Sequence, residues 1–164
     1  MALANVYKKQ VALLLRVLPF VTEEKCFALK GGTTINLFVR DMPRLSVDID
    51  LTYVPVAPRP ESLADIDAAV QHIAAKVKDK IPGALVHETR KEGAIVKLVV
   101  RAQNVQIKIE VTPVLRGCVY EPVVIFSYPH LRNLELGDNP LPDEVRANLA
   151  GAEASPHLEQ LRQC

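Results

Sequence analysis

The 164-residue sequence predicts an α+β fold, a mixed β-sheet with helices packed on one side. Helical and strand-like apolar patterns alternate along the chain, which is the first indication of this class. Apolar residues make up 49% of the sequence, enough to fill a core at this length. The formal net charge is only +1, which argues against a protein that coats nucleic acid by bulk charge.

The first elements are a helix and a buried strand. Apolar residues recur at helical spacing over Val6–Leu18, and Pro19 is expected to end this helix. The short apolar run Cys26–Leu29 predicts a buried strand that ends in a sharp turn at Gly31-Gly32. The turn is the first feature of the chain that is of chemical interest.

A short helix, a loop and a second strand are expected next. Thr33 or Thr34 is a suitable N-cap for a helix that continues to Val39. Residues 40–46 are polar and contain a proline, which predicts a loop. Val47–Leu51 alternates strictly between apolar and acidic residues, as a strand with one buried face does.

The remaining pattern predicts a long helix followed by three strands. Glu61–Lys80 has an apolar stripe at helical spacing and ends before a Pro-Gly pair. Residues 84–89, 94–102 and 105–111 are separated by turn residues, as in an antiparallel meander. Residues 1–128 are therefore expected to form the main domain, with 129–164 as an irregular or weakly helical tail.

Targeting signals are not evident in the sequence. No apolar run approaches the roughly 18 residues of a membrane span, and no signal peptide is recognisable. The three cysteines, Cys26, Cys118 and Cys164, are widely spaced and odd in number. We interpret them as reduced thiols of a cytoplasmic protein.

Two aspartates, Asp48 and Asp50, alternate with apolar residues in the predicted second strand. Both carboxylates share one face of the strand, with Cα atoms roughly 6.5–7 Å apart. Neighbouring carboxylates repel each other unless a proton or a cation intervenes, and Mg²⁺ prefers such oxygen ligands. The pattern also fits an acidic pair that faces water on an edge strand, so metal binding is one of two interpretations.

Two further features favour a phosphate and metal site. Gly31 and Gly32 allow a phosphate to approach the backbone closely, although an ordinary strand-to-helix turn has the same pattern. Glu110 lies in an alternating segment and becomes a third carboxylate if its strand lies beside the aspartate strand. Alternatively, Glu110 and Lys108 form the exposed face of an ordinary strand.

The chain thus contains Lys-Gly-Gly-Thr at 30–33, Arg-x-Ser-x-Asp-x-Asp at 44–50, and a later apolar-acidic-apolar strand. This combination, over residues 26–113, resembles the AbiEii-type toxin nucleotidyltransferases of the DNA polymerase β-like superfamily. The resemblance implies a minimal nucleotidyltransferase fold with residues 1–128 as the catalytic core. It implies a catalytic, metal-binding set that holds two Mg²⁺ ions: Asp48, Asp50 and Glu110, the last as general base or second-metal ligand. It also implies a set of residues that borders the triphosphate: Lys30, Gly31, Gly32, Thr33, Arg44 and Ser46.

The resemblance further implies Mg²⁺-dependent transfer of a nucleoside monophosphate from an NTP to an acceptor, with a tRNA 3′ end expected. The setting would be a cytoplasmic toxin of a toxin–antitoxin or phage-defence system, with a cognate antitoxin as partner. The family continues into a helical domain with a Lys…Arg-Asp-x-x-Asp-Leu motif that nothing after Tyr120 matches, so 129–164 is expected to be a truncated second domain. Two alternatives are an inactive module that binds a nucleotide or a protein, and the same chemistry on a protein tyrosine or a small-molecule hydroxyl.

Overall fold

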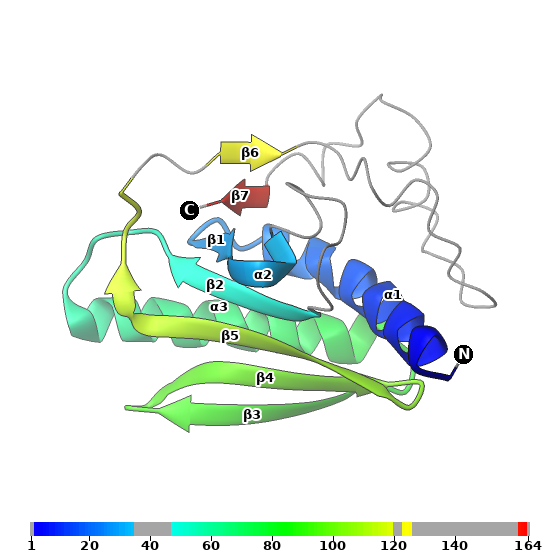
Figure 1. The fold of residues 1–164 in the computed structure, drawn as a ribbon. Helices are drawn as coiled ribbons and strands as arrows, with labels where there is room; N and C mark the ends of the chain where they lie inside the picture. The colour runs from blue at the N-terminus through cyan, green and yellow to red at the C-terminus, as the bar shows by residue number, and fades with distance from the viewer. Residues whose placement is uncertain (1, 35–46, 120–122, 126–160, 164) are drawn as a thin grey trace.

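The computed structural model describes residues 2–34, 47–119, 123–125 and 161–163 (Figure 1). Within these ranges the strands form one seven-stranded sheet with the order β3-β4-β5-β2-β1-β7-β6. The helices are α1 (Ala2–Thr22), α2 (Gly31–Thr34) and α3 (Arg59–Lys80). The strands are β1 (Phe27–Lys30), β2 (Asp48–Tyr53), β3 (Leu85–Lys91), β4 (Ala94–Ala102), β5 (Val105–Arg116), β6 (Val123–Ile125) and β7 (Leu161–Gln163).

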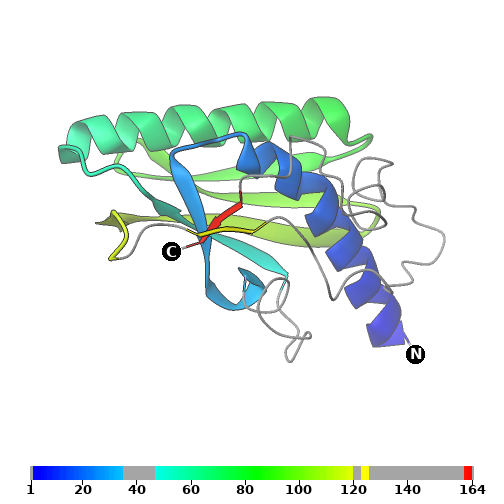
Figure 2. The same cartoon turned by 90° about the horizontal axis from the view of Figure 1, so that it is seen from above.

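The two long helices, α1 and α3, lie on the same face of the sheet, as Figures 1 and 2 show. Their apolar stripes and the sheet form one core, to which Ile49, Leu51 and Tyr53 of β2 contribute fully buried side chains. The stripe predicted for α3 is buried at Ile66 and Ile73. The predicted α+β class with helices on one side is confirmed, and the opposite face is left for the polar side chains of β2 and β5.

Helix α1 is longer than its sequence pattern predicts. The expectation that Pro19 ends the helix is wrong, because α1 continues through it to Thr22. A proline removes its own N–H donor and its ring crowds the carbonyl group four residues earlier, but its own carbonyl group stays available. The Pro19 carbonyl accepts hydrogen bonds from Thr22 Oγ1 at 2.8 Å and from the Glu23 N–H at 3.3 Å. Burial of Val21 adds packing energy that offsets the lost hydrogen bond.

The predicted meander of β3, β4 and β5 is confirmed. Gln103 and Asn104 connect β4 to β5 with φ angles of 51° and 61°, as a two-residue hairpin turn of type I′ requires. β5 extends to Arg116 rather than ending at Val111, because it also pairs in parallel with β2. This parallel pairing places β5 inside the sheet, between β4 and β2.

Several predictions fall on parts of the chain outside the description. The expected N-cap at Thr33 or Thr34 is wrong, because α2 begins at Gly31 and includes both threonines. The rest of the short helix up to Val39, the loop at 40–46 and most of the tail lie outside the described residues, so the domain division at residue 128 stays a prediction. The described end of the tail forms β7, which pairs with β1 and β6. No helix in the described ranges is long and apolar enough to cross a membrane.

The cysteines differ from the sequence interpretation in one respect. Cys26 is a free thiol, as expected, and burial raises its pKa to about 11. The prediction of a reduced thiol is wrong for Cys118, which is disulfide-bonded. Wide spacing in the sequence does not prevent pairing once the fold brings distant segments together. Cys164 lies outside the described residues.

Candidate active site

The strand that carries Glu110 lies directly beside the aspartate strand. β2 and β5 run in parallel with Asp50 opposite Glu110, and β1 places Lys30 on the other side of Asp50. Because neighbouring strands are about 4.8 Å apart and paired residues point to the same side, these side chains share one face. This face is opposite to the one that packs against α1 and α3, since Ile49 and Leu51 on either side of Asp50 are buried.

Lysines alternate with the acidic residues on this face. Lys97 of β4 lies opposite Glu110, and its Nζ is 2.6 Å from Glu110 Oε1. Lys108 of β5 lies opposite Asp48, with 3.6 Å between its Nζ and Asp48 Oδ2. Two of the three carboxylates are therefore paired with an ammonium group.

Lys30 continues the row at the end of β1. Its Nζ donates a hydrogen bond of 2.8 Å to Thr112 Oγ1 on β5. The lysine therefore reaches across β2 at the level of Asp50, and its positive charge acts on that carboxylate. A cation at this end of the site is suitably placed for an anionic substrate.

Asp50 is the electrostatic centre of the group. Its pKa is raised above the ordinary value, first by burial and then by the negative charges of Glu110 and Asp48. The positive charges of Lys30 and Lys108 oppose this shift in part. A carboxylate with a raised pKa in such surroundings is stabilised by a nearby cation.

The raised pKa predicts how Asp50 affects stability. The folded protein binds the Asp50 proton more tightly than the unfolded chain does, so stability falls as pH rises from about 3.9 through the raised pKa. Asp50→Asn removes this loss and is expected to raise the melting temperature near neutral pH. Melting curves should show the two proteins converging below about pH 3.5. A variant that melts below wild type at pH 7 would contradict this expectation.

Gly31 lies against Asp50. Its φ is +82°, and a Cβ atom at this position would be 2.6 Å from Asp50 Oδ2. The first glycine of the pair is therefore required twice, for the left-handed backbone and for the close approach to the carboxylate. Gly32 and Thr33 follow Gly31 in the short helix α2. Arg44 and Ser46 lie outside the described residues.

The donor set fits a divalent cation that is only partly coordinated by protein. Carboxylate oxygens are the ligands that Mg²⁺ prefers, and Mg²⁺ commonly keeps waters or substrate phosphates as its other ligands. Within the described ranges no three acidic, histidine or cysteine residues converge closely enough to hold a metal ion by themselves. The residues thus fit a site that the substrate completes, rather than a closed protein cage.

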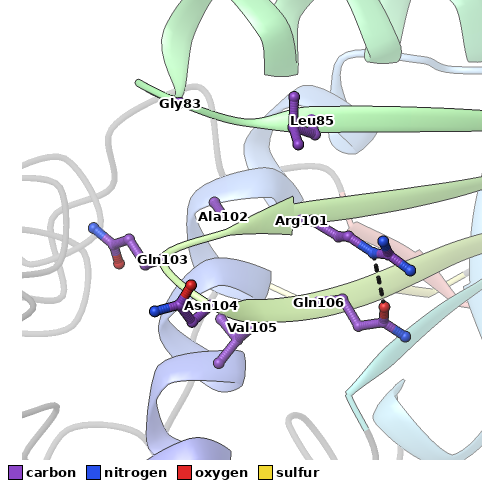
Figure 3. Close-up of a pocket in the computed structure, with 8 residues that line it drawn as sticks. All are labelled: Gly83, Leu85, Arg101, Ala102, Gln103, Asn104, Val105 and Gln106. Atoms are coloured by element: carbon purple, nitrogen blue, oxygen red, sulfur yellow. Dashed lines mark hydrogen bonds between the residues drawn. The ribbon is translucent and has the colours of Figure 1, made fainter.

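Two open hollows among the described residues lie elsewhere. One, of about 450 Å³, surrounds the turn between β4 and β5, where Leu85, Arg101 and Gln106 line it (Figure 3). Its lining residue on β5 nearest to the candidate site is Gln106, roughly 13 Å along the strand from Glu110. The other, of about 470 Å³, lies between the start of α3 and the β3–β4 turn. Neither includes a carboxylate of the candidate site.

Lys97 is the site residue that sequence reasoning missed. A signal for it was present, because the two-residue turn at Gln103-Asn104 fixes the register of β4 against β5. That register places Lys97 directly opposite Glu110. The sequence identifies Lys108 only as part of an exposed strand face. Its pairing with Asp48 depends on the parallel contact between β5 and β2.

Comparison with known proteins identifies the family. The family model described as "Nucleotidyl transferase AbiEii toxin, Type IV TA system" matches residues 12–143, which include the glycine pair and all three carboxylates. Comparison with curated proteins and with solved structures finds no match. The chain therefore belongs to the AbiEii nucleotidyl transferase toxin family.

Proposed function

We propose that this protein transfers a nucleoside monophosphate from an NTP to a hydroxyl group of an acceptor. The family is a nucleotidyltransferase toxin family of type IV toxin–antitoxin systems, which supports a transferase. The observation that carries the proposal is the alignment of Asp48, Asp50 and Glu110 on neighbouring strands, with Gly31 against Asp50. Acidic side chains beside a glycine turn suit a substrate that combines phosphates with divalent cations.

The three carboxylates are proposed to hold the cations. Nucleotidyltransferases generally use an NTP and divalent metals, and we expect two Mg²⁺ ions held by Asp48, Asp50 and Glu110. If bound there, the cations would supply positive charge for the oxygens between which the phosphoryl group is transferred. The protein contributes the fixed spacing of the carboxylates, which follows from the register of β2 and β5.

The transfer forms one bond and breaks one bond at the α-phosphorus. The acceptor oxygen bonds to the α-phosphorus, and the bond from that phosphorus to the bridging oxygen breaks, releasing pyrophosphate. The hydroxyl proton passes to a base, for which Glu110 is our candidate, or Glu110 instead completes the second metal site. Asp48 and Asp50 remain ionised to hold positive charge near the reacting phosphate.

The triphosphate is proposed to lie at the glycine end of the site. Lys30 provides a positive charge there, and Gly31 and Gly32 leave the backbone open to phosphate oxygens. The family resemblance adds three further residues to the nucleotide-binding set: Thr33, Arg44 and Ser46.

The proposal also includes the acceptor and the biological setting of the reaction. The resemblance favours a tRNA 3′ end as acceptor, a cognate antitoxin as partner and a role in phage defence. We place the protein in the cytoplasm because NTPs and tRNA are found there. A nucleic-acid acceptor is compatible with a near-neutral chain, since the local lysines rather than net charge would meet its phosphates.

Paired labelling experiments test the reaction. The protein is incubated with Mg²⁺ and NTPs labelled on either the α- or the γ-phosphate, with total tRNA, protein or small-molecule hydroxyls as acceptors. We expect label in tRNA from the α-labelled NTP only, because pyrophosphate carries the γ label away. Label in protein or in a small molecule instead of tRNA would support the proposed nucleotide transfer but show that the acceptor is different. NTP binding without transfer to any acceptor would instead favour an inactive binding module.

A further inference from the structure

We propose that Lys97 and Lys108 occupy the carboxylate site until a divalent cation displaces them, and that the displaced lysines then bind the triphosphate. This exchange makes cation binding and nucleotide binding mutually dependent. The inference rests on the proposed function of the same site and concerns its regulation. It assigns two lysines a role that follows from their ion pairs with the proposed metal ligands.

The ion pairs put each ammonium where a cation would otherwise be attracted. Lys97 Nζ lies 2.6 Å from Glu110 Oε1, and Lys108 Nζ lies 3.6 Å from Asp48 Oδ2. The lysines come from β4 and β5, which both lie on the same side of the aspartate strand β2, and both pairs are held by strand register. The two ammonium groups partly neutralise the site, which lowers the repulsion among its carboxylates.

The pairs are also weak enough to exchange. The side chains of Lys97 and Glu110 are 32% and 42% exposed, and those of Lys108 and Asp48 are 38% and 43% exposed. Ion pairs with this much solvent contact contribute only about 0–1 kcal/mol to stability. A lysine side chain is long and flexible, so its ammonium moves away from a divalent cation without backbone rearrangement.

Displaced lysines remain on the same face as the bound cation. An ammonium without its carboxylate is attracted to phosphate oxygens, for which lysine is a common ligand. A triphosphate therefore stabilises the state in which the cation is bound, and the cation stabilises the state in which the triphosphate is bound. This reciprocity follows from thermodynamic linkage.

Equilibrium binding of Mn²⁺ tests the exchange without measuring turnover. Free Mn²⁺ is quantified by electron paramagnetic resonance with the full chain, in the absence of nucleotide and then with an NTP analogue that has a methylene group between the α- and β-phosphorus. Without nucleotide, we expect Lys97→Met to bind Mn²⁺ about tenfold more tightly than wild type does. An ammonium group about 6 Å from a divalent cation repels it by an amount that corresponds to about tenfold in affinity, even at the dielectric constant of water. The analogue should tighten Mn²⁺ binding strongly in wild type and less in Lys97→Met.

Two matched variants control for structure. Lys78→Met removes a lysine whose Nζ is 3.5 Å from Glu88 Oε1, between α3 and β3, and should leave Mn²⁺ affinity at the wild-type value. Lys97→Arg keeps the charge and should also bind Mn²⁺ as wild type does. Thermal melting of each variant shows that it is folded.

The outcomes separate this inference from the proposed function. If Asp50→Asn abolishes Mn²⁺ binding but Lys97→Met binds Mn²⁺ with unchanged or lower affinity, the exchange is overturned and the proposed function stands. If neither wild type nor Lys97→Met binds Mn²⁺ either with or without the NTP analogue, the proposed function fails and the exchange fails with it. Tighter binding by Lys97→Met, with Lys97→Arg unchanged, supports the exchange.

Discussion

Replacing Asp50 by asparagine is expected to lower the rate of nucleotide transfer by at least about a thousandfold, or about 4 kcal/mol of transition-state stabilisation. Asp50 lies between Glu110 and Lys30 in strand register, and both other acidic residues act on its charge. Asparagine keeps the shape of the side chain but loses the negative charge that would hold a cation. Single-turnover transfer of α-labelled NTP to the accepted substrate measures the loss.

The control for this variant is Asp79→Asn in the last turn of α3. Asp79 is exposed and pairs with Lys80 at the surface, so its loss should leave transfer within about twofold of wild type. Asp50→Asn is expected to be at least as stable as wild type near neutral pH, so unfolding would not explain its inactivity. Transfer by Asp50→Asn within tenfold of wild type would remove the carboxylate from the mechanism.

The local elements of the fold follow from the sequence because each has a short-range cause. The apolar stripe of α3 is continuous from Ile66 to Val77, and all its predicted central positions are buried. The β4–β5 turn contains Asn104, a residue type that tolerates a left-handed backbone, and its two residues close the hairpin between two apolar strands. Patterns of this kind depend on neighbours in the chain and need no knowledge of the tertiary structure.

The long-range features could not be predicted in the same way. The parallel pairing of β2 with β5 joins segments on either side of α3, and neither strand encodes its partner. The continuation of α1 beyond Pro19 depends on packing of Val21 in the core, which outweighs a local propensity. The disulfide at Cys118 likewise depends on tertiary proximity rather than on spacing.

The same distinction between local and long-range features applies to the residues of the candidate site. Asp48 and Asp50 are two positions apart on one strand, so their common face could be predicted from alternation alone. The sequence predicts Glu110 as a third carboxylate only if β5 lies beside β2, and the structure has that contact. The lysine partners of the acidic residues come from two strands and depend on two registers at once, which explains why Lys97 was missed.

Gly31→Ala is the second substitution for which we expect a large effect, at least about a hundredfold loss of transfer. The added Cβ would be 2.6 Å from Asp50 Oδ2 and 3.4 Å from the Asp50 Cβ, so the carboxylate has to move. A displacement of about 1 Å at a reacting centre is sufficient for a loss of this size. Initial rates of transfer with α-labelled NTP measure it.

Gly93→Ala is the matched control, because the two glycines share their backbone strain and differ in their surroundings. Gly93 has φ +87°, close to the +82° of Gly31, but a Cβ atom there would contact nothing within 4 Å. Both variants should lose about 1–2 kcal/mol of stability from the left-handed backbone. The atom that the added Cβ would meet, Oδ2, is at the end of the Asp50 side chain, which can rotate away. We therefore expect Gly31→Ala to lose little more stability than Gly93→Ala. If both variants fold equally well and only Gly31→Ala loses transfer, the activity depends on the position of the Asp50 carboxylate. Equal activity of the two variants would show that the close approach of Gly31 to Asp50 has only a structural role.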